Sequence, residues 1–358
     1  MNRFSLYKRW HDIKSEASTY NISPFALIVS LIKFRLVTGL GPRYYLIAGF
    51  ANPVITENEK YQHISHKAYH HALDILNPSP YRKTTHHKLI EIAFLSLSCI
   101  PSSNFIGFLH QKKGFLNHTT PLCNERDLNQ CLAGYVSEYI CFKPVEGHGG
   151  KGVSIYKVCQ KSNTSHFELE SISDKNTIST TKLLSQYQSD INKQGLLIES
   201  YVNQHATYQQ YNPSSINTIR VWVLDDGNNI NVIGAYLRVG RKGAIVDNGD
   251  AGGIIFPICM TTTEILPGFT TSTIARENFI NHPDSNQVIA GQALPMWDDI
   301  VTFSQHVLRC LPNSRFAGLD IAITDDGPLV IEINVCPDKD GAAYANIPSK
   351  LLQNAAEN

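Results

Sequence analysis

The sequence predicts a mixed α+β protein whose helices and strands form two layers around a cleft. Residues 1 to about 80 carry helical patterns, helix and strand patterns mix from about residue 83, and strands dominate from Asn217 to Asn334. The 358 residues exceed one average domain and suffice to bury a large core. We therefore divide the chain into a mostly helical N-terminal region, 1–82, and a mixed region, 83–350.

The N-terminal region contains the longest apolar run of the chain, from Phe25 to Val37. Lys33 and Arg35 interrupt this run, and it is too short to span a bilayer. It predicts a helix packed in the core, with a membrane-surface helix as the alternative. The charged, amphipathic opening residues do not resemble a secretory signal. The sequence NPSPYR at 77–82 has the chemistry of a linker.

The mixed region is read from the periodicity of its apolar residues. Alternating patterns predict strands at 165–173, 195–202, 218–224 and 230–239. The segment 174–194 between the first two is predicted to be helical. A further amphipathic helix is predicted from Trp297 to Pro312, ahead of a terminal pair of strands.

A glycine-rich loop joins two predicted strands in the segment CFKPVEGHGGKGV, 141–153. Glycine allows positive φ and a close approach of the backbone to a ligand, and consecutive N–H groups form an anion-binding concavity. Lys143, just before the loop, adds an ammonium group suited to phosphate oxygens. The loop does not open a helix, so it is neither a P-loop nor a dinucleotide fingerprint. A surface hairpin with no ligand is the alternative.

An acidic hairpin follows near the C-terminus, where two apolar strands flank the turn DDGP. Asp320 lies on the first strand, and Glu332 and Asn334 lie two residues apart on one face of the second. Carboxylate and amide oxygens are ligands suited to Mg²⁺ that carries substrate phosphates. The alternative is a hairpin with outward polar residues. Asp325 and Asp326 are expected to be turn residues.

Two arginines stand on predicted strands, Arg220 in TIRVWVL and Arg238 in AYLRVG. A guanidinium donates hydrogen bonds in pairs and therefore suits phosphate or carboxylate recognition. An ion pair across the sheet is the alternative for each. Arg241 and Lys242 are the next candidates, whereas Asp247 and Asn248 have the character of turn residues. No Ser-His-Asp or Cys-His arrangement is evident.

Composition excludes several classes of protein. The formal net charge is zero, so the chain lacks the basic footprint of a nucleic-acid-binding protein. Its eight cysteines include no Cys-x-x-Cys pair, which argues against a zinc site and a disulfide framework. Free thiols of this kind predict a cytoplasmic protein. The cysteines are Cys99, Cys123, Cys131, Cys141, Cys159, Cys259, Cys310 and Cys336.

Six sequence blocks in a fixed order resemble the ATP-grasp superfamily, most closely its branch associated with sugar transfer and polysaccharide biosynthesis. The resemblance covers roughly residues 80–345. The blocks are residues 86–110, the glycine-rich loop 141–153, LLIESYVNQHA at 196–206, NTIRVWVL at 217–224, residues 235–254 and the acidic hairpin.

The resemblance implies an ATP-grasp fold, in which two α/β subdomains clamp ATP, preceded here by the helical N-terminal region. The flap subdomain would span about 125–200, and the metal-binding and acceptor subdomain about 201–350. ATP and Mg²⁺ are the implied cofactors, with Asp320, Glu332 and Asn334 as metal ligands. The implied nucleotide-binding residues are Lys88, Lys143, Gly147, His148, Gly149, Gly150, Glu199, Tyr201, Val202 and His205.

Family members often place a carboxylate for the ribose just past the adenine-binding hinge. Here that stretch reads Asn203-Gln204-His205, so Gln204 or His205 is expected to take that role.

The implied activity is an ATP-dependent carboxylate–amine ligation through an acyl phosphate, with Arg220 and Arg238 near the carboxylate. The partners would be a small-molecule or glycan carboxylate, such as a uronic acid, and an amine or amino acid. No nucleic acid and no membrane span are expected. A phosphotransferase and a non-catalytic nucleotide-binding module are the alternatives. The acid, the amine and the oligomeric state stay open.

Overall fold

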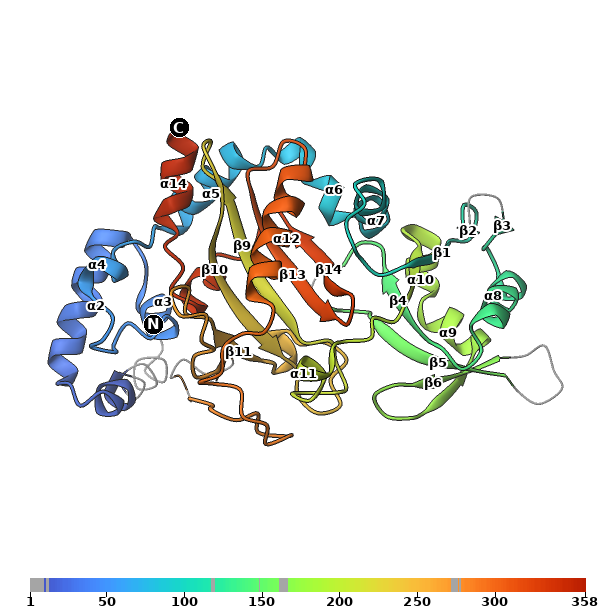
Figure 1. Ribbon diagram of the computed structural model, residues 1–358, viewed down its shortest axis with the longest axis horizontal. Helices are drawn as coiled ribbons and strands as arrows, with labels where there is room; N and C mark the ends of the chain where they lie inside the picture. Colours follow the sequence, from blue (N-terminus) through green and yellow to red (C-terminus); the bar gives the residue numbers. More distant parts are fainter. Residues whose placement is uncertain are drawn as a thin grey trace.

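The computed structural model describes residues 10, 13–116, 120–147, 149–160, 167–271, 276 and 278–358. Two antiparallel sheets form its body and lie side by side along the long axis of the molecule (Figure 1). One has eight strands in the order β3-β2-β1-β8-β4-β5-β6-β7, and the other has six in the order β12-β11-β10-β9-β13-β14. The α+β architecture predicted from the sequence is confirmed.

The eight-stranded sheet, here called the flap sheet, is built from short strands with α8 (Glu125–Leu132) and the pair α9 (Thr180–Gln186) and α10 (Gln188–Lys193) as its helices. Leu128, Leu183 and Ile191 from these helices are buried in one cluster with residues of the strands. The strands are β1 (Phe105–Leu109), β2 (Phe115–Leu116), β3 (Thr120–Pro121), β4 (Tyr139–Pro144), β5 (Ser154–Gln160), β6 (Phe167–Ser171), β7 (Thr177–Ser179) and β8 (Leu196–Ser200).

The predicted helix over 174–194 is wrong at its beginning and is divided in the middle. Residues Thr177–Ser179 form β7, in which Ile178 pairs with Leu169 of β6. The Ser179 hydroxyl then caps α9 by accepting from the Lys182 amide. Pairing with a sheet edge thus overrides the helical pattern of the first residues.

The six-stranded sheet, here called the inner sheet, has longer strands and is covered by α12 (Trp297–Cys310), which contacts β9, β10, β13 and β14. The predicted helix from Trp297 and the predicted terminal hairpin are both confirmed. A bulge interrupts that hairpin between Asp320 and Ile321. The strands are β9 (Thr218–Asp225), β10 (Ile230–Val239), β11 (Ile254–Pro257), β12 (Phe269–Thr270), β13 (Phe316–Thr324) and β14 (Gly327–Asn334).

The N-terminal helices lie at the end of the molecule next to the inner sheet (Figure 1). They comprise Ile13–Thr19, α2 (Pro24–Thr38), α3 (Pro42–Ile47), α4 (Glu57–Lys60) and α5 (His66–Leu76). Gly39 ends α2 because it adopts the left-handed region at φ 73°. Among the described residues no single helix is long and apolar enough to cross a membrane; Ile13–Thr19 and α2 pass that test only as a pair bent by 108°.

The segment predicted as a linker is fastened to the inner sheet. Asn77 is 1% exposed, and its side-chain amide donates to the carbonyls of Phe316 (2.7 Å) and Val335 (2.5 Å). The chain then forms η1 (Ser79–Tyr81), α6 (Lys83–His86) and α7 (Lys88–Leu97). The hydrogen bonds of Asn77 thus hold the segment before α7 against the inner sheet. The C-terminal helices α13 (Asp340–Tyr344) and α14 (Lys350–Glu357) complete the fold, and α14 packs on α5.

Candidate active site

A cleft of about 230 Å³ lies between the flap sheet and the inner sheet. Its walls come from the β4–β5 turn, the end of β8, and strands β9, β10, β13 and β14. The structure brings these predicted residues together along it: Lys88, Lys143, Gly147, Gly149, Gly150, Glu199, Tyr201, Val202, Arg220, Arg238, Asp320, Glu332 and Asn334. His148 lies outside the described residues.

The flap wall is built around a buried lysine. β4 pairs with β8 so that Cys141 stands opposite Glu199, and the Nζ of Lys143 lies 2.5 Å from the Oε2 of Glu199. Burial alone would lower the pKa of Lys143, but the charge of Glu199 outweighs it and raises the pKa above its usual range. Lys143 therefore stays protonated and carries a positive charge in the cleft.

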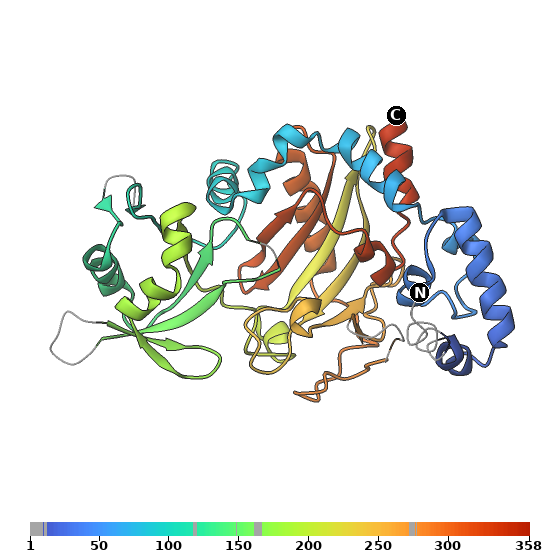
Figure 2. The same cartoon turned by 180° about the vertical axis from the view of Figure 1, so that it is seen from behind.

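The glycine-rich turn reaches across to the inner sheet (Figure 2). Gly149 and Gly150 have φ of 64° and 68°, which glycine adopts without strain. A Cβ on Gly150 would lie 2.6 Å from Cγ1 of Val246, and the side-chain amide of Asn248 donates to the carbonyl of Gly149. The glycines thus allow the flap to close on the loop after β10.

Lys88 joins the two walls from the first turn of α7. Its Nζ lies 3.2 Å from the carbonyl oxygen of Gly147 in the flap and 3.4 Å from Oε1 of Glu332 on β14. The Lys88 amide also donates to the carbonyl of Val145 at 3.1 Å. An ammonium group placed between a glycine-rich turn and a carboxylate is well located to contact phosphate oxygens.

The inner wall holds two arginines against one carboxylate. β9 and β13 pair so that Arg220 faces Asp320, whose two oxygens accept from the Nε and Nη2 of Arg220. Arg238, on β10, places Nη2 2.9 Å from Oδ2 of Asp320. Burial would raise the pKa of Asp320, but Arg220 and Arg238 outweigh it and hold the pKa below its usual value. All three groups are therefore charged.

A second buried carboxylate, Asp247, extends this network and was missed by the sequence analysis, which treated it as a turn residue. Its Oδ1 lies 3.2 Å from Nη2 of Arg238, and its Oδ2 accepts from the Thr218 amide at 2.9 Å. Burial raises the pKa of Asp247 despite Arg238 nearby. Only the position of Asp247 within the block 235–254 could have indicated this role, because local spacing gives no sign of it.

The predicted metal ligands share one end of the cleft. In the β13–β14 hairpin, Asp320 stands opposite Glu332 and Gly318 opposite Asn334. Among the described residues, no group accepts a hydrogen bond from the buried Nδ2 of Asn334. Asp320 uses three of its roughly four lone-pair positions on the arginines, which leaves one for a cation.

This oxygen set fits Mg²⁺, which takes carboxylate and amide oxygens together with phosphate and water. The described residues contain no group of three or more His, Cys, Asp and Glu side chains able to hold a metal. The amide oxygen of Asn334 is therefore needed to complete the set.

Glu91 is a second residue that the sequence analysis did not identify. It lies one turn after Lys88 on α7, is 4% exposed, and its Oε1 accepts from the Ile333 amide at 2.5 Å. Burial, and next the charge of Glu332, raise the pKa of Glu91 well above its usual value. Through this hydrogen bond Glu91 braces β14 between the two cleft residues Glu332 and Asn334.

The structure does not bring Gln204 or His205 to the described lining of the cleft. The Gln204 amide exchanges hydrogen bonds with the backbone of Asn217, with Nε2 to carbonyl at 2.5 Å and Asn217 N to Oε1 at 3.2 Å. The Nδ1 of His205 accepts from the Thr207 amide at 3.2 Å and caps α11 (Ala206–Gln209). Both residues thus have structural partners, and the ribose assignment stays a prediction.

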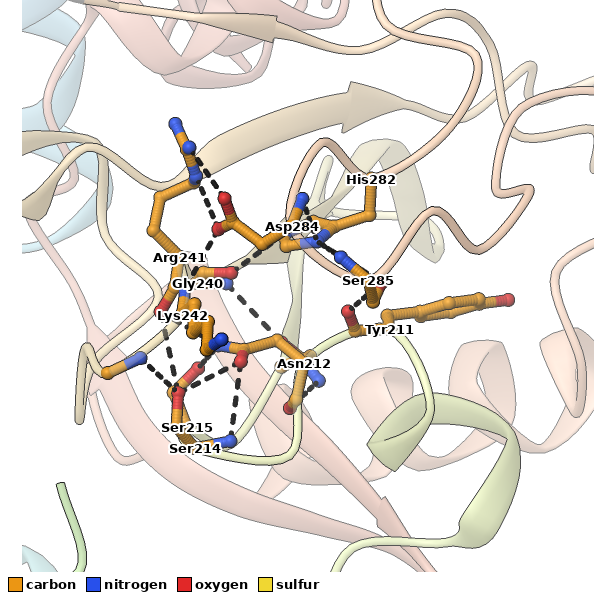
Figure 3. Close-up of polar contacts among 12 residues, drawn as sticks. Tyr211, Asn212, Ser214, Ser215, Gly240, Arg241, Lys242, His282, Asp284 and Ser285 are labelled. Carbon is orange, nitrogen blue, oxygen red and sulfur yellow. Dashed lines mark hydrogen bonds and ion pairs between the residues drawn. The ribbon is translucent and has the colours of Figure 1, made fainter.

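A polar cluster outside the cleft anchors the loop that carries Asp247 (Figure 3). Arg241 binds Asp284 through two bonds, at 2.7 and 2.8 Å, and the Nε2 of His282 donates to the carbonyl of Gly240 at 2.9 Å. The hydrogen bonds from Arg241 hold the pKa of Asp284 below its usual value. The Arg241 guanidinium is thus paired with Asp284 and does not face the cleft.

Lysines and a glycine-rich turn on one wall of the cleft face two arginines and an oxygen-bearing hairpin on the other. This arrangement is that of an ATP-grasp protein. The chain belongs to the sugar-transfer associated ATP-grasp family, whose model matches residues 97–352. The family membership predicted from the sequence is confirmed. No curated protein matches this chain closely enough to count as a relative.

Solved structures similar to this one share little sequence with it. D-alanine–D-alanine ligase from Bacillus anthracis is 14% identical with a TM-score of 0.39, over 76% of this chain and 68% of its own. Biotin carboxylase from Campylobacter jejuni is 11% identical with a TM-score of 0.45, over 79% and 49%. L-amino acid ligase from Bacillus licheniformis is 12% identical with a TM-score of 0.40, over 77% and 48%.

Proposed function

We propose that this protein is an ATP-dependent carboxylate–amine ligase that works through an acyl phosphate. The observation that carries the proposal is the single cleft with two chemically different walls. One wall offers Lys88, Lys143 and the glycine-rich turn, and the other offers two arginines and an oxygen-bearing hairpin. A triphosphate held on the first wall would direct its terminal phosphate toward the second.

The flap wall would bind the nucleotide. Lys143 and Lys88 would offset phosphate charge as point charges, and the glycine-rich turn would close over the phosphates through its backbone amides. Tyr201 and Val202, directly after β8, line the cleft where the adenine would lie. Mg²⁺ on Asp320, Glu332 and Asn334 would supply charge neutralisation and alignment of the phosphates.

The reaction needs positioning and charge stabilisation rather than a nucleophilic side chain. A carboxylate oxygen of the acceptor would attack the γ-phosphorus, the bond to the β-phosphate oxygen would break, and ADP would leave. An amine would then attack the acyl carbon, a C–N bond would form, and inorganic phosphate would leave while the amine proton passes to solvent. Arg220 and Arg238 would hold the acceptor carboxylate and stabilise the charge that develops at the transferred phosphoryl group.

The finer identity of the substrates rests on the family alone. We propose a uronic acid or another glycan or small-molecule carboxylate as the acceptor, and an amino acid or amine as the second substrate, in the biosynthesis of polysaccharides. We place the reaction in the cytoplasm because the eight free cysteines suit a reducing compartment.

The test is release of ADP and phosphate from ATP and Mg²⁺ against panels of acids and amines. A ligase releases inorganic phosphate only when both an acid and an amine are present, and the product is their conjugate by mass spectrometry. Phosphate found on a single acceptor would show a kinase instead. Glu332→Gln should abolish turnover, while Asp325→Asn, in the turn of the same hairpin, should not. Nucleotide binding without turnover on any panel would indicate a binding module.

A further inference from the structure

The helix α2 is apolar on two opposite faces, and the part of the chain that the structure describes covers only one of them. Leu27, Leu31 and Phe34 pack into the N-terminal core with α3. The opposite face carries Phe25, Val29, Ile32 and Leu36, all of which are exposed. A helix that is hydrophobic all round is normally buried on all sides.

These four residues form a continuous stripe, here called the α2 stripe. Their spacing of four, three and four residues places them on one side of the helix over about 16 Å. Phe25 is 75% exposed and Leu36 is 81% exposed, and Val37 beside them is 57% exposed. An exposed apolar patch of this kind marks an interaction site, whereas single exposed apolar residues do not.

The helix α2 lies at the outer edge of the molecule in both views (Figure 1, Figure 2). This edge is the end opposite the flap sheet, so a partner on α2 would leave the cleft open to its substrates.

The charges around the stripe are basic. Residues 17–56 contain no Asp or Glu, and their only charged side chains are Lys33, Arg35 and Arg43. Lys33 and Arg35 flank the stripe on α2 and are exposed, and Lys33 contacts Glu57 at 3.6 Å. An apolar stripe flanked by basic residues complements a bilayer with anionic headgroups. A second copy of the same face would instead bring like charges together.

We propose that α2 binds the surface of an anionic lipid membrane. The α2 stripe would enter the boundary between headgroups and acyl chains, with Lys33 and Arg35 beside the headgroup phosphates. Membrane binding of α2 does not depend on the proposed ligase activity, but it would place the cleft next to a membrane surface.

The test is flotation of the full-length protein with phosphatidylcholine vesicles, with and without phosphatidylglycerol. The wild-type protein should float with the anionic vesicles, and added salt should weaken that binding. Leu36→Glu should reduce the partition coefficient by about tenfold or more, because transfer of one Leu side chain from water into the membrane raises that coefficient by at least this factor. The matched control is Leu97→Glu, at an isolated residue of α7 that is 85% exposed, which should bind as the wild type does.

Circular dichroism should show the same helix content in both variants, since neither side chain is buried in the fold. Failure of the wild-type protein to float, or equal flotation of Leu36→Glu, would overturn the proposal. Concentration-dependent dimers without lipid, in sedimentation, that disappear in Leu36→Glu would also overturn it, by assigning the α2 stripe to a second copy of this chain.

Discussion

The two walls of the cleft hold their positive charges in different ways. On the flap wall, each lysine faces a single carboxylate: Lys143 contacts Glu199, and Lys88 contacts Glu332 across the cleft. On the inner wall, Arg220 and Arg238 share Asp320, and Arg238 also contacts Asp247. The first arrangement leaves ammonium groups that can turn toward a ligand, whereas the second is a closed network.

The lysines of the flap wall are suited to ligand binding, whereas the arginines of the inner wall are part of the structural framework. A lysine is a point charge on a flexible stem, and it suits a wall that must close over phosphates. Arginines fixed by shared carboxylates cost no reorganisation when a charged substrate arrives, which is what stabilisation of a developing charge requires. Removing a charge from the arginine network should therefore affect stability strongly, whereas changes to the flap lysines or to Glu332 should affect ligand binding and turnover more than stability.

The largest effect is expected from Asp320→Ala. It leaves two buried guanidinium groups without their shared partner, which should lower the free energy of unfolding by roughly 3–5 kcal/mol. Urea unfolding measures this. The matched control is Asp284→Ala, which breaks the more exposed pair with Arg241 and should cost under about 1 kcal/mol. Similar losses in the two variants would show that the inner wall is not a closed network.

A large effect on turnover alone is expected from Glu332→Gln. The side chain keeps its shape but loses a charged metal ligand, so kcat should fall by about 10²-fold or more. The free energy of unfolding should change by less than about 1 kcal/mol, because Glu332 is partly exposed and lies outside the arginine network. Asp325→Asn serves as the control in kinetic and unfolding assays. Equal effects of the two changes would remove the hairpin as the metal site.

An effect on nucleotide binding is expected from Lys143→Ala. ATP with Mg²⁺ should raise the melting temperature of the wild-type protein, because a ligand that binds only the folded state stabilises it. The variant should bind ATP about ten- to a hundredfold more weakly, since a hydrogen bond to a charged phosphate is lost. Lys83→Ala, at an exposed pair with Glu146 in the flap, should keep the full shift. An unchanged shift in Lys143→Ala would exclude Lys143 from the site.

The smallest effect is expected from Arg238→Lys. The charge near Asp320 and Asp247 is kept, but the fork that would bind a carboxylate is lost. The KM for the acid should rise by about tenfold with little change in kcat, and ATP binding should survive. Steady-state kinetics at varied concentrations of the acid measures both KM and kcat. Loss of ATP affinity would place Arg238 at the triphosphate, and no change in either property would make it a structural residue.

Local patterns were enough to predict the terminal hairpin, and they indicated Lys143, Asp320, Glu332 and Asn334 as candidate site residues. The other nucleotide-binding candidates, such as Lys88 and Glu199, came from the family resemblance and stay predictions. The turn at Asp325-Asp326 and the glycines around residue 149 determine which strands pair, and pairing alone brings Glu332 opposite Asp320. Asp247 and Glu91 were missed because their roles depend on groups distant in sequence, Arg238 on a neighbouring strand and Ile333 on β14. The start of the predicted helix 174–194 was wrong for the same reason, because residues 177–179 pair with the edge of β6 as a strand.

The contact between Lys88 and Glu332 also has a consequence for the order in which the protein forms during synthesis. The two residues are 244 positions apart, and Asn77 likewise binds carbonyls 239 and 258 positions later. Contacts of such high sequence separation form slowly, and here they require nearly all of the chain. On the ribosome, the flap sheet is complete long before β14 emerges. If ATP binds in the cleft as proposed, it can stabilise only the completed cleft, and the larger part of the chain folds before that.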